Sequence, residues 1–113
     1  MKSVLIAGLL SALWVGQVHA QVYYSFPDWD RLSEAEQAIY IAGAYDSLVS
    51  IASPNTASAA RHFSRCVATN RLSSEQLARN VRTFVATHPA LQKGPVQGGL
   101  VNYLVELCGA PPN

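Results

Sequence analysis

The chain has only two cysteines, Cys66 and Cys108, and they constrain its fold more than any other feature. A small protein that meets oxidising conditions seldom keeps a pair of free thiols, so we expect a disulfide between them. Closing a loop of about forty residues stabilises the folded chain by about 4 kcal/mol in the chain-entropy model. Two independent buried thiols are the alternative.

The first twenty residues have the order of a secretory signal peptide. Lys2 precedes an apolar stretch from Val4 to Val15, and Val18-His19-Ala20 then forms a small-residue cleavage site. The apolar stretch is shorter than the roughly 20 residues that span a bilayer, which argues against a membrane anchor. We therefore expect cleavage after Ala20 and a soluble protein exported to the periplasm.

Residues 21–113 are one small domain by size, and their charge is balanced. Without Lys2, seven basic residues face seven acidic residues. This balance gives no electrostatic argument for binding nucleic acid or, after signal cleavage, an anionic membrane.

Residues 21–32 mix aromatic side chains with Pro27 and show no helical period, so we expect an extended aromatic arm. Its aromatic residues are expected to cover the core, and a binding stripe for a sugar or peptide is the alternative. These residues are Tyr23, Tyr24, Phe26 and Trp29.

Helical patterns dominate residues 33–113. Ser33 and Glu36 form a capping box that starts a helix, which we expect to run to about Ala52. Gly43 lies in its middle, where close approach of another helix would offset the cost of a glycine. A shorter helix over residues 57–66, capped by Thr56 or Ser58, is expected to end at Cys66.

The stretch "LSSEQLARNVRTFVATHPAL", residues 72–91, carries both a start and a stop signal. Ser73 and Gln76 form a second capping box, and Pro89 prevents the helix from continuing. A last helix is expected from Val96 to Cys108 with Gly109 as its stop. Its inward residues are expected to be Val96, Leu100, Tyr103, Leu104 and Leu107. These patterns predict an all-α fold, a small bundle of three to four short helices stapled by one disulfide.

Few residues suggest catalysis or metal binding. Arg61, His62 and Arg65 lie close together in the second helix, and His62 is four residues from Cys66, as in a metal-ligand pair. Two ligands do not make a zinc site, and Cys66 is expected in the disulfide. His88 is better explained as a partner of a helix C-terminus than as a general base. We therefore expect a binding protein and not an enzyme, with no metal and no cofactor.

Four segments together resemble a known family. They are "YIAGAYDSL" at 40–48, Cys66, the 72–91 stretch and "LVNYLVELC" at 100–108. In this order they resemble the Tai-type immunity proteins, which protect bacteria from peptidoglycan amidases delivered by type VI secretion. The resemblance covers residues 38–108 and places the Tai-like domain at 33–113.

The resemblance implies a periplasmic, often dimeric inhibitor that inserts a loop into the catalytic groove of an amidase. We expect the loop from Leu91 to Gly98 to make this contact, with Gln92 and Lys93 as its polar tip. An ordinary solvated connection is the alternative. The residues expected to bind the partner are Leu91, Gln92, Lys93, Gly94, Val96 and Gln97.

Two other functions are considered. A small periplasmic acid-stress chaperone would share the export, the helices and the disulfide, but seven carboxylates are a poor supply for an acid-driven switch. A small secreted hydrolase would have to use His62 or His88 with a partner brought from elsewhere in the sequence.

Overall fold

The computed structural model describes residues 23–50 and 53–112, which form helices joined by short connections and no strand. The elements are α1 (Phe26–Asp30), α2 (Glu34–Ser50), α3 (Ala57–Thr69), α4 (Ser74–Ala86), the 3-10 helix η1 (Pro89–Leu91) and α5 (Val96–Cys108). The predicted all-α fold is confirmed, with five α-helices in the described residues where three to four were expected. The predicted signal peptide, residues 1–20, and the expected end of α2 at Ala52 lie outside the described residues.

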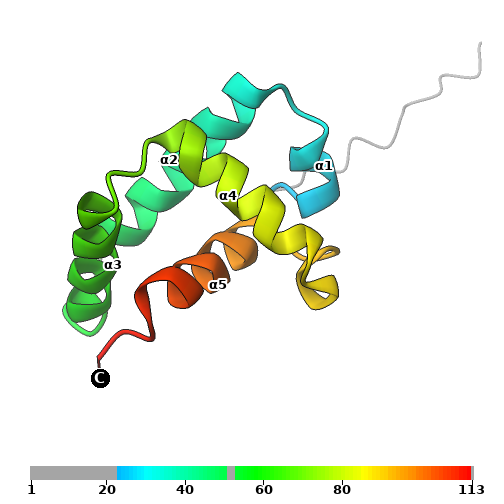
Figure 1. Ribbon diagram of the computed structural model, residues 1–113. Coiled ribbons are helices and arrows are strands. Elements are labelled where there is room, and N and C mark those ends of the chain that lie inside the picture. The colour runs from blue at the N-terminus through cyan, green and yellow to red at the C-terminus, as the bar shows by residue number, and fades with distance from the viewer. Residues whose placement is uncertain (1–22, 51–52, 113) are drawn as a thin grey trace, which may run out of the picture.

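α3 and α4 each pack against both α2 and α5 (Figure 1). α4 crosses over α2, its principal neighbour, and α5 packs against α4 and reaches α3. The short helix α1 covers the opposite end, where it contacts the start of α5. α5 thus links the N-terminal segment to α3, over about 18 Å of helix at 1.5 Å per residue.

The core is apolar and draws on every α-helix. Its fully buried side chains include Trp29, Ile41, Val81, Val85, Val96, Leu100 and Leu104. Within the described parts of the chain, no buried side-chain nitrogen or oxygen lacks a hydrogen-bond partner. Burial of a polar group without a partner costs free energy, so this complete pairing favours one packed state.

Both predicted capping boxes are confirmed. The Glu36 backbone N–H donates to Ser33 Oγ, and the Ser33 N–H donates to Glu36 Oε1, each at 3.2 Å. Ser73 and Gln76 make the same exchange at 3.2 and 2.9 Å. These local bonds fix where α2 and α4 begin.

The expectation of an extended arm is wrong for residues 26–30, which form α1. The Ser25 side chain accepts a hydrogen bond from the Asp28 N–H, and Pro27 lies in the first turn, where a proline costs no helical hydrogen bond. Trp29 is fully buried, and its Nε1–H donates to the Gln37 carbonyl at 3.3 Å. Phe26 and Trp29 therefore cover the core as expected.

α3 continues past Cys66 to Thr69, which corrects the expected helix end. The Arg71 N–H donates to the Ala68 carbonyl and the Leu72 N–H donates to the Val67 carbonyl, as in a Schellman motif. Arg71 occupies the left-handed position of this motif, with a φ of 51°. Glycine is usual there, so the sequence lacked the common stop signal.

α5 has the predicted bounds, but Leu107 is 37% exposed and not inward. Cys108 and not Leu107 faces α3, because the disulfide ties the last turn of α5 to that helix. A Cβ added at Gly43 would meet nothing within 4 Å, so the expected close helix approach is absent there. It occurs at Gly99, where a Cβ would lie 2.8 Å from Val85 Cγ2 of α4.

Candidate functional site

The loop expected to bind a partner is folded against the body of the protein. Leu91 is half-buried against the core, and Val96 is fully buried. The Gln92 side-chain amide donates to the carbonyls of Val85 and Ala86 at 3.2 and 3.0 Å. Both carbonyls lie in the last turn of α4, where helical partners are lacking. Gln92 is thus a cap of α4 and not a free polar tip, and Val96 is a core residue.

Main-chain hydrogen bonds tie this loop to the N-terminal segment. The Phe26 N–H donates to the Gly94 carbonyl at 2.9 Å, and the Val96 N–H donates to the Tyr24 carbonyl at 3.1 Å. An isolated antiparallel bridge joins Ser25 to the same loop. These bonds fix the loop relative to residues 24–26.

Four exposed side chains therefore belong to one end of the molecule. Lys93 and Gln97 project from the loop and from the first turn of α5. Tyr23 is 58% exposed and Tyr24 is 41% exposed. The Tyr24 ring packs edge-on against Tyr40 of α2, with ring centroids 5.2 Å apart, which holds it in place. We call these four residues, Tyr23, Tyr24, Lys93 and Gln97, the tyrosine–loop surface.

The predicted disulfide is confirmed at the other end of α5. Cys66 and Cys108 are bonded, with their Cα atoms 5.7 Å apart. Beyond Cys108 the chain lies along α3: His62 Nε2–H donates to the Gly109 carbonyl at 2.9 Å, and Ser58 Oγ–H donates to the Pro112 carbonyl at 3.3 Å. The disulfide thus positions a C-terminal segment over α3.

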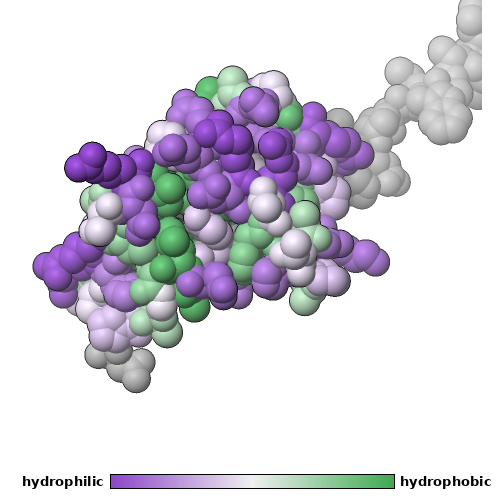
Figure 2. Space-filling model, in the orientation of Figure 1, coloured by the Kyte–Doolittle hydropathy of each residue, from purple (hydrophilic) through white to green (hydrophobic). Residues whose placement is uncertain are grey.

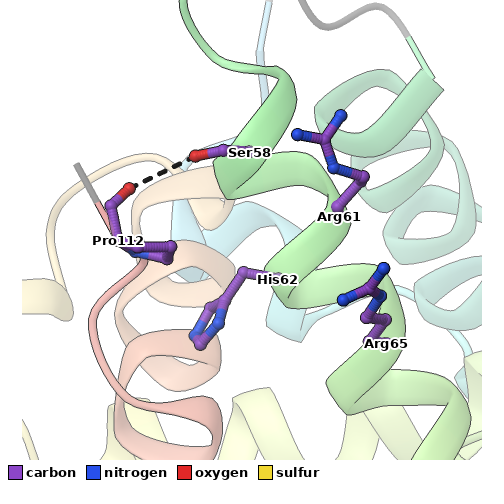
Figure 3. Close-up of a pocket in the computed structure, with 5 residues that line it drawn as sticks. All are labelled: Ser58, Arg61, His62, Arg65 and Pro112. Carbon is purple, nitrogen blue, oxygen red and sulfur yellow. Dashed lines mark hydrogen bonds between the residues drawn. The ribbon is translucent and has the colours of Figure 1, made fainter.

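A pocket of about 270 Å³ lies between α3 and this segment. Figure 3 shows Ser58 and His62 facing Pro112, with Arg61 and Arg65 on adjacent turns of α3. We call these five residues the α3 pocket. Arg61 and Arg65 are exposed, and neither forms an ion pair with any carboxylate of the described residues.

A second pocket of about 230 Å³ lies between α2 and α4. Its lining residues, the α2–α4 pocket, are Glu34, Ala35, Gln37, Glu75, Ala78 and Arg79. The Arg82 guanidinium approaches Glu34 to 4.0 Å and donates to Gln37 Oε1 at 3.2 Å. The pKa of Glu75 is lowered mainly by a hydrogen bond from the backbone N–H of Glu75 itself, and to a smaller extent by the positive charge of Arg79. The two carboxylates of this pocket, Glu34 and Glu75, therefore have partners within the protein.

The two histidines of the described residues, His62 and His88, and both cysteines make structural contacts. His88 Nδ1–H donates to the Phe84 carbonyl at 2.6 Å, at the C-terminal end of α4 as predicted, and its ring stacks on Phe84. Cys66 is bonded to Cys108 and not paired with His62 as a ligand. The described residues contain no group of three or more side chains suited to hold a metal ion.

Apolar side chains also reach the surface. Figure 2 shows a hydrophobic band between α3 and α5, framed by hydrophilic residues. Val105 and Leu107 in the last turns of α5 are each 37% exposed. Among the described helices, none is long and apolar enough to cross a membrane.

Comparisons with protein-family models, curated proteins and solved structures found no match for this chain.

Proposed function

We propose that the chain is a periplasmic binding protein that inhibits a peptidoglycan amidase, in the manner of the Tai-type immunity proteins that it resembles. The observation that carries the proposal is the tyrosine–loop surface. A loop fixed by main-chain hydrogen bonds lies beside two exposed tyrosines, one of them held by ring packing.

Rigidity favours binding at this surface. A contact surface that is already ordered loses little conformational entropy when a partner binds. Tyrosine combines a large apolar ring with a polar hydroxyl, and it is enriched among the residues that dominate binding energy. The hydrogen bonds from Gln92 to α4 hold the same loop against the body of the protein. The signal-peptide pattern and the disulfide are both compatible with an oxidising compartment.

Affinity capture tests the proposal directly. The oxidised protein serves as bait in the envelope fraction of the native host at neutral pH, and any stoichiometric partner is identified by mass. We expect a peptidoglycan amidase whose activity the bait inhibits. Absence of a partner, followed by binding of many unfolded proteins on acidification, would favour the acid-stress chaperone instead.

Variants then locate the contact. Tyr24→Ala and Lys93→Ala should each weaken inhibition by about tenfold or more if they lie at the centre of the interface. Gln92 is left unchanged because its substitution would remove the cap of α4. Arg71→Asn is the matched control, since it removes one exposed positive charge at the turn after α3. Equal inhibition by all variants would exclude the tyrosine–loop surface.

A further inference from the structure

The α3 pocket concentrates positive charge without compensation. Arg61 and Arg65 are four residues apart, so they share one face of α3, and His62 lines the same pocket on the side of Pro112 (Figure 3). No acidic residue occurs in the chain between Asp46 and Glu75. No carboxylate of residues 23–50 or 53–112 forms an ion pair with either arginine.

This arrangement does not stabilise the helix. Like charges four residues apart on a helix destabilise it by about 0.2–0.5 kcal/mol. The favourable place for a cation is the last turn of a helix, and the last turn of α3 has no basic residue. Residues that lower the stability of the element in which they lie are expected at functional sites.

The surroundings give the cluster a defined shape. Two hydrogen bonds, from His62 to Gly109 and from Ser58 to Pro112, hold the C-terminal segment beside α3. The disulfide links α3 to the last residue of α5, just before this segment. The two guanidinium groups are therefore presented at the rim of a pocket with a fixed wall (Figure 3).

We infer that the α3 pocket binds carboxylate groups on an acidic segment of the protein partner. A guanidinium offers two parallel N–H donors that match one carboxylate, so two guanidiniums on adjacent turns suit two neighbouring acidic side chains. The pocket volume of about 270 Å³ admits side chains of this size. The inference rests on the proposed function, because it assigns the acidic segment to that partner.

A polyanion is a poorer fit for this site. Nucleic acids and anionic membranes present long rows of charge and select extended basic surfaces. Here the net charge of the whole sequence is only +1, and the cluster occupies one short stripe of α3. Discrete carboxylates match this limited footprint.

Isothermal titration of the oxidised protein tests the site with defined probes. The first probe is a blocked tetrapeptide of alternating glutamate and aspartate, the second is its glutamine and asparagine counterpart, and the third is inorganic phosphate. We expect saturable binding of the acidic peptide only. An Arg61→Gln/Arg65→Gln variant should bind it about tenfold or more weakly, as expected when charge-assisted hydrogen bonds are lost.

Arg71→Asn is the matched control, because it removes a nearby positive charge outside the pocket and suits the left-handed backbone there. It should change the Kd of the acidic peptide by less than about twofold. Equal losses in the control, binding of phosphate as tight as that of the acidic peptide, or no saturable binding would each overturn the inference. Circular dichroism confirms that the variants keep their helices.

The same variants separate this inference from the proposed function. If the wild-type protein captures an amidase and the double variant captures it equally well, the pocket inference fails and the proposed function stands. If no amidase is captured, the proposed function fails, and peptide binding then reports only whether the pocket recognises carboxylates.

Discussion

The α3 pocket and the α2–α4 pocket are similar in size but differ in how their charges are satisfied. Beside the α2–α4 pocket, Arg82 of α4 contacts two of its lining residues, Glu34 and Gln37, and Gln37 is nearly fully buried. In the α3 pocket Arg61 and Arg65 have no carboxylate partner among the described residues. Charged groups that are paired inside the protein support its fold, whereas an unpaired cluster at a shaped surface is available to a ligand.

Removal of the disulfide should give the largest difference in stability between the α3 region and the α2–α4 region. Replacement by Cys66→Ser/Cys108→Ser opens a loop of 42 residues and should lower the free energy of unfolding by about 4 kcal/mol in the chain-entropy model. Urea denaturation of the oxidised protein and the variant measures this loss. Native-state hydrogen exchange should show the largest loss of protection in α3 and the smallest at the α2–α4 contact. A uniform loss would mean that the two regions unfold as one unit.

Gln37→Leu should be the most damaging single substitution in the α2–α4 region. The Gln37 amide donates to the carbonyls of Trp29, Asp30 and Leu32 at 3.1–3.2 Å. Leucine would remove the side-chain donor to these carbonyls and the acceptor of the Arg82 guanidinium, at a cost of about 2–3 kcal/mol. Gln97→Leu, at an exposed position of α5, should change stability by less than about 0.5 kcal/mol. Comparable losses in both variants, measured by urea denaturation, would contradict this role of Gln37.

Features encoded by neighbouring residues could be predicted from the sequence. The two capping boxes, the stop at Pro89 and the bounds of α5 depend on contacts within a few residues, and all appear as expected. The disulfide followed from the presence of only two cysteines in a chain expected to be exported. The helix α1 was missed because its aromatic composition suggested an arm, although Ser25 and Pro27 supply a start signal.

Features that depend on packing between helices could not be predicted. Gly43 and Gly99 are both helical glycines, and only the fold determines that Gly99 is the one against α4. The spacing of Arg61 and Arg65 was visible in the sequence. The wall of the α3 pocket could not be predicted. It is formed by the segment after α5, which the disulfide holds beside α3. The contact between Tyr24 and the loop likewise joins distant parts of the sequence.

Acidification should weaken the N-terminal ends of α1, α2 and α4 before it affects α3. A hydrogen bond from Ser25 lowers the pKa of Asp28, and hydrogen bonds from Ser33 lower the pKa of Glu36. The pKa of Glu75 is lowered by a hydrogen bond from the backbone N–H of Glu75 itself. Folding thus favours the charged forms of these carboxylates. Their contribution to stability is fully present above the pKa values of the unfolded chain, about 4, and is lost as the pH falls through the lower pKa values of the folded protein.

Thermal unfolding between pH 7 and pH 3 measures this dependence. The wild-type protein should lose more stability over this range than Glu36→Gln, because the variant has one carboxylate fewer to protonate. Amide exchange at low pH should increase first at the starts of α2 and α4. If α3, which contains no acidic residue, lost protection first, the assignment of acid sensitivity to the capped helix starts would be wrong.

The smallest predicted effects have opposite signs at Arg82, beside the α2–α4 pocket, and at Arg65 of the α3 pocket. Arg82→Gln removes a charged donor to Gln37 and should lower the free energy of unfolding by about 1 kcal/mol. Arg65→Gln removes repulsion from Arg61 and should raise it by about 0.3 kcal/mol, while binding of the acidic peptide falls. Urea denaturation of both variants beside the wild-type protein measures the difference. A stability loss in Arg65→Gln equal to that in Arg82→Gln would mean that Arg65 supports the fold, and the contrast between the two pockets would disappear.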